Sequence, residues 1–175
     1  MLGVVLRKKH VVLGISLFVL LIAAMLISYF VAYNVVSDAV YKLGSSYSGS
    51  INPETTGASF SCEVVYENTA IIPLTIDHVN LVIFIYNSSV PYDGHLYFMG
   101  PPSIPQAIDI GNVVNENKIV PANGQAAISA QFDINSIDAL DLIHSGNYSV
   151  GATYQELTVS GTVLFWHFTP QIAFQ

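Results

Sequence analysis

The side chains able to do chemistry in this 175-residue chain are few and scattered. No two of its five histidines stand four apart on an expected helix or two apart on an expected strand, the spacings that place two metal ligands on one face. These histidines are His10, His78, His95, His144 and His167. A single cysteine, Cys62, excludes a multi-cysteine zinc site and an internal disulfide. The sequence predicts no metal site.

Two sets of acidic residues partly resemble a calcium site and a glycosidase site but match neither. The stretch 133–138, Asp-Ile-Asn-Ser-Ile-Asp, begins like a calcium loop, but Ile137 and Asp138 stand where a ligand and a glycine are needed. Glu63 and Glu67 lie four apart on an expected strand, and therefore about 13 Å apart, too far for a glycosidase pair.

Nucleophilic catalysis also lacks its motifs. The chain contains neither Gly-x-Ser-x-Gly nor His-Glu-x-x-His. Cys62 falls on the apolar face of an expected strand, where a buried thiol is inert, although a bridge to a partner chain is the alternative. We therefore expect a protein that is not an enzyme and that carries no cofactor.

Charge is scarce and unevenly placed. Charged residues make up 10% of the chain, against about 25% in average proteins, and the net charge is −7. Arg7, Lys8 and Lys9 lie together near the start, whereas all 12 acids lie at Asp38 or later. A net negative charge argues against nucleic acid as a partner.

The elements that position these side chains begin with an uncharged segment, Val11 to Tyr33. Its 23 residues would form a helix of about 34 Å, enough to cross a hydrocarbon core of about 30 Å. We expect a transmembrane helix over 11–36. The basic residues in 1–10 predict that this end stays in the cytoplasm and that the remainder faces outward.

Two other interpretations of this segment fit less well. A cleaved signal peptide has a shorter apolar stretch, and 35–39 is a poor cleavage site. A pilin-like leader needs a small residue where the chain has His10 and Val11. Small side chains along the helix would permit close helix packing in the bilayer. They are Gly14, Ser16, Ala23, Ala24 and Ser28.

The outer part divides into a linker and a domain. Residues 37–57 are predicted to form a linker, because 44–50 is small and polar, although helical spacing continues to about Leu43. Period-two patterning predicts strands over 58–67, 74–86, 95–99, 125–134, 148–154 and 158–168. A bulge near His78 would restore the parity of the second strand.

A short helix interrupts these strands. The spacing of Ile137, Leu140 and Ile143 predicts it over 136–144, with Ser136 as N-cap and Gly146 as terminator. Residues 58–175 are therefore expected to form an all-β sandwich with one short helix, outside the membrane.

Several surface features favour contacts. Asn87 and Asn147 each begin an Asn-x-Ser sequon, which suits an outward-facing domain. A Pro-rich loop and the aromatic C-terminal segment are either ordered parts of the sandwich or partner contacts. The candidate contact residues are Pro101, Pro102, Trp166, Phe168 and Phe174. Low charge favours either burial in an assembly or an extreme external medium.

The order of features from Phe60 onward resembles the LEA-2/WHy family of water-stress and hypersensitive-response proteins. The resemblance rests on Tyr-Glu-Asn at 66–68 before a Pro-led strand, the long strand at 79–86, Val-Pro-Ala-Asn-Gly at 120–124, and the helix ending in Ser145-Gly146. It covers about 110 residues and implies an immunoglobulin-like β-sandwich without enzymatic activity. Departures are Thr69 after Asn68 and a long Pro-rich segment, 100–117.

Three functions remain open. The first is a single-pass membrane protein that displays the sandwich outside the cell for interaction with proteins or the envelope, its partners being the bilayer and other surface proteins or itself. The second is a subunit of an extracellular filament or surface layer. The third is a carbohydrate- or lipid-binding module.

Overall fold

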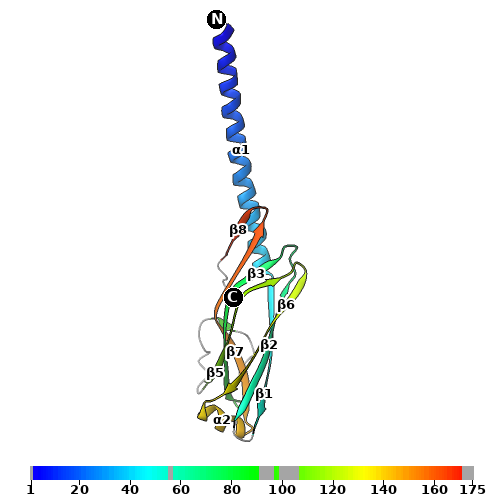
Figure 1. Cartoon of the computed structure of the whole chain (residues 1–175), viewed down its shortest axis with the longest axis vertical. Helices are drawn as coiled ribbons and strands as arrows, with labels where there is room; N and C mark the ends of the chain where they lie inside the picture. The colour runs from blue at the N-terminus through cyan, green and yellow to red at the C-terminus, as the bar shows by residue number, and fades with distance from the viewer. Residues whose placement is uncertain (1, 55–56, 91–96, 99–106, 171–175) are drawn as a thin grey trace.

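A computed structural model describes residues 2–54, 57–90, 97–98 and 107–170, with side chains in 12–54, 57–90 and 107–170. A long N-terminal helix leads into a domain built mainly of strands (Figure 1). In chain order the elements are α1 (Leu2–Tyr41), β1 (Leu43–Pro53), β2 (Ala58–Asn68), β3 (Leu74–Asn87), β4 (Tyr97–Phe98), β5 (Ile108–Val120), β6 (Gly124–Ile134), α2 (Ile137–His144), β7 (Tyr148–Val163) and β8 (Trp166–Phe168).

Two sheets form the domain. One has the order β1-β2-β6, and the other has the order β4-β7-β3-β5, with β8 paired to β7. All described pairings are antiparallel except β4 with β7. The predicted mainly-β domain behind an N-terminal apolar helix is confirmed.

One hydrophobic core lies between the sheets. Phe60, Val64 and Tyr66 of β2 face inward at period two, as the alternation predicts. The central strand β3 lies between β7 and β5 and buries Leu81 and Ile83 completely. Full burial of each such apolar side chain is worth about 1.5–3 kcal/mol.

The bulge predicted near His78 is confirmed. The pairing of β3 with β7 shifts between Ile76 and His78, and again between Asn80 and Leu81. Each shift moves the following side chains to the opposite face. Ile76, Val79 and Leu81 are therefore all buried although their spacing is not strictly two.

The prediction of a linker over 37–57 is wrong. Residues 37–41 continue α1, and β1 pairs with β2 from Leu43 opposite Asn68 to Pro53 opposite Ala58. The Ser- and Gly-rich composition resembles a flexible connector, but alternate residues of β1 gain backbone hydrogen-bond partners in β2. Only every fourth residue, Leu43, Tyr47 and Ile51, packs on the core, a period that reads neither as helix nor as strand.

Other differences concern the second half of the chain. Strand β5 was not predicted, because its buried residues Ile110, Val113 and Val120 are spaced irregularly among polar ones. The two predicted strands over 148–168 are one 16-residue strand, β7, and a short return strand, β8. Of the predicted strand at 95–99, only 97–98 lies within the described residues.

The short helix α2 is confirmed with its predicted ends. The Ser136 hydroxyl accepts a hydrogen bond from the Ala139 N–H at 3.4 Å. Gly146 adopts a φ of 73°, and its N–H donates to the Ile143 carbonyl at 3.0 Å. The helix buries Ala139 and Ile143 against the end of the sheets.

A buried asparagine joins two loops at the end of the domain next to α1. The Asn68 Nδ2 donates to the carbonyls of Ile72 at 2.8 Å and Pro121 at 3.1 Å. Its Oδ1 accepts from the Ala70 N–H at 3.0 Å. Because both ends of the amide are satisfied, its burial stabilises the β2–β3 and β5–β6 connections.

Two tyrosines meet in the core between the sheets. The Tyr154 hydroxyl of β7 donates to the Tyr66 hydroxyl of β2 at 3.1 Å. Burial raises the pKa of both phenols above their ordinary value, and the Coulomb effect of Tyr154 adds to the shift at Tyr66. Both groups are therefore neutral in the folded protein.

This pair predicts a loss of stability in alkali. Since the phenols ionise only on unfolding, the stability they provide is complete below the unfolded pKa of about 10 and falls above it. Each such group lowers the free energy of unfolding by about 1.4 kcal/mol per pH unit. Tyr66→Phe should reduce this slope by the contribution of about one ionising group. Urea unfolding in detergent between pH 9 and about 12 would measure the free energy of unfolding and hence the slope. The control Tyr41→Phe, at an exposed site, should leave the slope unchanged.

Candidate functional site

The junction between α1 and the domain is the best-defined feature outside the core. Along α1, four residues are buried against the domain at positions spaced by four, three and one. They are Ala32, Val36, Ala39 and Val40. This spacing forms one stripe on a helix. The domain end of α1, which carries the stripe, contacts β7 and lies beside the strands in Figure 1.

A glycine permits the close approach of helix and sheet. A Cβ atom placed on Gly161 of β7 would lie 3.0 Å from Val36 Cγ1 and 3.1 Å from Leu74 Cδ2. These separations are tighter than normal van der Waals contact. A side chain at position 161 would therefore require the Val36 or Leu74 side chain to shift by a few tenths of an ångström.

Aromatic side chains extend the junction along the helix. Trp166 and Phe168 of β8 each lie 5.1 Å from the Tyr29 ring, edge to face, and Phe168 also lies 5.5 Å from Tyr33. The Trp166 Nε1–H donates to the Ser28 hydroxyl at 3.3 Å. Such aromatic pairs contribute about 0.5–1.5 kcal/mol each beyond their buried area.

The helix thus has two parts. Its residues from Val12 to Val31 are mostly exposed and apolar, whereas the part from Ala32 on packs on the domain. By length and composition, Val12–Tyr41 is a candidate membrane span, and an 18-residue window within it has a mean hydropathy of 2.6. The 20 residues from Val12 to Val31 measure about 30 Å as a helix, the thickness of a hydrocarbon core.

The predicted helix-packing residues lie on this exposed part. Gly14, Ser16, Ala23 and Ala24 are exposed. Gly14 has no non-neighbouring heavy atom within 4 Å of a built Cβ. Ser28 differs, because its hydroxyl accepts from Trp166 and donates to the Met25 carbonyl at 2.8 Å.

The predicted partner-contact residues fall into two groups. Trp166 and Phe168 pack on the protein's own helix, and Phe168 is only 8% exposed, so it offers no free surface. Pro101, Pro102 and Phe174 lie outside the described residues. The sequence shows the excess of aromatic residues in this strand. It does not show that they contact α1, because the helix lies more than 120 residues away in the chain.

The two sequons lie together at the end of the domain far from α1. Strand β3 runs from Leu74, opposite Gly161 beside α1, to Asn87, opposite Tyr148. The Ser88 N–H donates to the Asn147 carbonyl at 3.1 Å. Asn147 is exposed and Asn87 half-buried, and the Asn87 Oδ1 accepts from Ser89.

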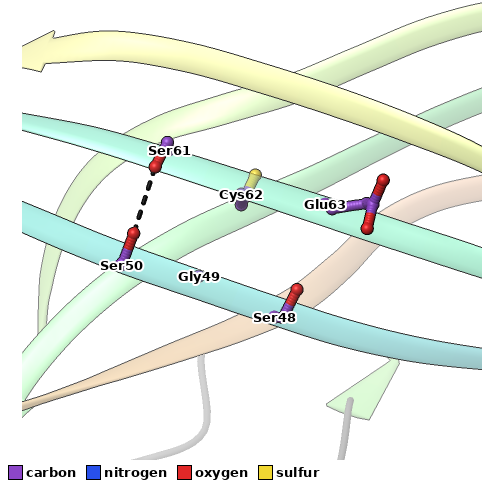
Figure 2. Close-up of a pocket in the computed structure, with 6 residues that line it drawn as sticks. All are labelled: Ser48, Gly49, Ser50, Ser61, Cys62 and Glu63. Atoms are coloured by element: carbon purple, nitrogen blue, oxygen red, sulfur yellow. Dashed lines mark hydrogen bonds between the residues drawn. The ribbon is translucent and has the colours of Figure 1, made fainter.

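Figure 2 shows a shallow depression on the β1–β2 strand pair. It is lined by Ser48, Gly49, Ser50, Ser61, Cys62 and Glu63. The Ser50 and Ser61 hydroxyls share a hydrogen bond of 3.1 Å. No hydrogen bond joins the Glu63 carboxylate of this lining to either hydroxyl, so the depression shows no paired nucleophile and base.

One residue of this lining, Cys62, carries the single thiol of the chain. Cys62 is buried and faces inward, in register with Gly49. Burial raises the pKa of its thiol, and the backbone hydrogen bond at Ala130 offsets this only in part. Burial also raises the pKa of Tyr47, helped by Cys62. The thiolate, which is the nucleophilic form, is disfavoured.

Within the described part of the chain, no group of three His, Cys, Asp or Glu side chains has a metal-binding arrangement. His78 lies between two carboxylates across the strands, with Nδ1 3.6 Å from Glu116 Oε1 and Nε2 3.5 Å from Glu156 Oε2. Both carboxylates are exposed, so these pairs add little to stability.

Comparison with known proteins adds little about this chain. No family model and no curated protein matches it. A crystal structure of a protein from Archaeoglobus fulgidus is similar with a TM-score of 0.33 and 9% identity, over 74% of this chain and 90% of that one. An X-ray structure of a Northeast Structural Genomics Consortium target is similar with a TM-score of 0.32 and 10% identity, over 76% and 96%.

The contacts between α1 and the domain predict that substitutions of the two phenylalanines in the β7–β8 hairpin have unequal effects on stability. Phe168→Ala removes a ring buried against Tyr29 and Tyr33 and should destabilise the junction by about 3–5 kcal/mol. Phe165→Ala removes a ring that is 67% exposed and should change stability by less than about 0.5 kcal/mol in detergent. Thermal unfolding and limited proteolysis near Lys42 would measure both. Equal effects of the two variants would contradict the assignment of Phe168 to the junction.

Proposed function

We propose that this is a non-enzymatic, single-pass membrane protein that displays a LEA-2/WHy-like, immunoglobulin-like β-sandwich outside the cell membrane for interaction with proteins or the envelope. Residues 1–10 stay in the cytoplasm and α1 crosses the bilayer. The bilayer and other surface proteins, or further copies of the chain, are its partners.

The observation that carries this proposal is the division of α1. Its exposed apolar part matches the thickness of a bilayer, and the contact with β7 starts where that part ends. A soluble domain would leave about 20 residues of apolar helix in water, which the hydrophobic effect strongly opposes. The basic cluster before the helix supports a cytoplasmic N-terminus.

An interaction role is supported by one strand edge. Strand β1 pairs with β2 on one side, and within the described residues no strand pairs with its other side. Its sequence, 43–53, contains no charged residue, although edge strands are commonly protected by charge. An unprotected edge of this kind favours pairing with a strand from another chain.

The same edge also favours the second candidate function, a filament or surface-layer subunit, because copies of the chain can pair edge to edge. The two functions differ in what accompanies the protein. Purification from native membranes followed by mass spectrometry should find stoichiometric foreign partners for the first and a ladder of self-oligomers for the second. A lone monomer in gentle detergent would contradict both.

Membrane insertion can be tested with matched arginine substitutions. Leu20→Arg with Leu21→Arg places two charges in the middle of the exposed helix, at a cost of about 2.5–3.5 kcal/mol each. The double variant should appear in the soluble fraction after alkaline carbonate extraction, whereas the original chain should stay with the membrane. Ile119→Arg, at an exposed position on β5, is the control and should remain membrane-bound.

A further inference from the structure

We propose that the tip of the β7–β8 hairpin, Leu164 and Phe165, inserts into the outer leaflet of the bilayer, so that the domain touches lipid at a second point beside α1. This inference rests on the proposed membrane anchoring by α1. It assigns a lipid-binding surface to the domain itself.

The tip exposes two adjacent large apolar side chains. Leu164 is 75% exposed and Phe165 is 67% exposed. The Phe165 ring lies 4.9 Å from the Trp166 ring, so the tip is one continuous apolar surface with the aromatic junction. In water the apolar surface of both side chains stays exposed to solvent, whereas in lipid that surface would be buried.

The turn itself is unusual for a water-exposed loop. Val163 pairs with Trp166, so only two residues connect the strands. Leu164 adopts a φ of 58°, in the region where such turns normally hold glycine, asparagine or aspartate. A leucine there bears a backbone penalty and exposes apolar surface, which is consistent with selection for a lipid-facing side chain.

The contacts of the β7–β8 hairpin with α1 indicate how deep the tip lies in the bilayer. Trp166 bonds to Ser28, which is 16 residues, or about 24 Å, beyond Val12 and therefore close to the outer edge of the hydrocarbon core. That is the level at which tryptophan and tyrosine concentrate in membrane proteins. Phe168 contacts both Tyr29 and Tyr33, whereas Trp166 contacts Ser28 and Tyr29, so Phe168 lies farther from the N-terminus of α1. The hairpin therefore points along α1 toward its N-terminus, and its tip lies deeper than Trp166 (Figure 1).

Three segments at the same end of the domain contain no charged residue. Residues 157–170, 68–73 and 119–125 include no Asp, Glu, Lys or Arg. These last two segments lie together at this end, where the Asn123 N–H donates to the Ala70 carbonyl at 2.9 Å. The neighbouring charged pair on α1, Asp38 and Lys42, begins seven residues, about 10 Å, beyond Val31. No charged group on these segments would have to enter the bilayer with the tip.

The experiment uses the single tryptophan of the chain as a depth probe. The full-length protein is reconstituted in phosphatidylcholine vesicles whose acyl chains carry bromine near the headgroup, at mid-chain or near the end. Trp166 should be quenched most by bromine near the headgroup, by roughly half. A second variant, Phe165→Trp with Trp166→Phe, moves the probe to the tip. Its quenching maximum should shift toward mid-chain bromine, and acrylamide in water should quench it weakly.

The experiment distinguishes a failure of the membrane anchoring by α1 from a failure of the tip insertion. Vesicle flotation first establishes whether the protein is in the bilayer, and a protein that does not float overturns the anchoring itself. If the protein floats but the tryptophan at position 165 is quenched by acrylamide and not by any brominated lipid, the insertion of the tip is overturned. A partner protein that covers the tip is excluded because the vesicles contain only this chain.

A companion variant tests the contribution of the tip. Leu164→Asn with Phe165→Ser keeps a residue that tolerates positive φ and removes the apolar surface. It should lower the quenching of Trp166 by headgroup-side bromine at least roughly twofold, because the hairpin loses its lipid contact. Unchanged quenching would show that the packing of Trp166 on α1 alone sets its depth and would overturn the role of the tip.

Discussion

The close packing of α1 on β7 is the constraint on which the rest of the molecule depends. Val36 lies against Gly161, and the stripe from Ala32 to Val40 is buried in the same core as the sheets. Because helix and sheet share one core, they cannot move independently without exposing apolar surface. The domain is therefore held at a defined orientation to the candidate membrane span and is not tethered by a flexible chain.

This orientation gives the domain two different ends. The end beside α1 carries the aromatic hairpin, the loops joined by Asn68 and no charge in those segments. The opposite end carries α2 and both sequons (Figure 1). Between them, β1 continues directly from the helix and presents an uncharged edge. Lipid contact at one end, glycan at the other and protein contact along the edge would use separate surfaces.

The polar groups inside the domain serve structure. The Tyr66–Tyr154 pair joins the two sheets, and Ser160 donates to the Asp77 carboxylate at 2.9 Å. Burial raises the pKa of the Cys62 thiol, which disfavours its nucleophilic thiolate form. In the described part of the chain, the candidate chemistry found in the sequence is therefore dispersed.

The sequence by itself determined the elements that depend on local pattern. The uncharged apolar run, the alternation at 58–67, the bulge near His78 and the caps of α2 all follow from spacing and side-chain type within a few residues. The resemblance to the LEA-2/WHy family stays a prediction. Only the tertiary structure decided the rest, because the interactions involved join residues far apart in the chain.

Strand β1 exists because β2 supplies partners for a Ser- and Gly-rich backbone that has no strand pattern of its own. Trp166 and Phe168 are partner-contact candidates by sequence, and in the structure they pack on Tyr29 and Tyr33 of the chain's own helix. Hydrophobicity identifies a surface that must be covered, but it does not say which surface covers it. That choice is made by packing.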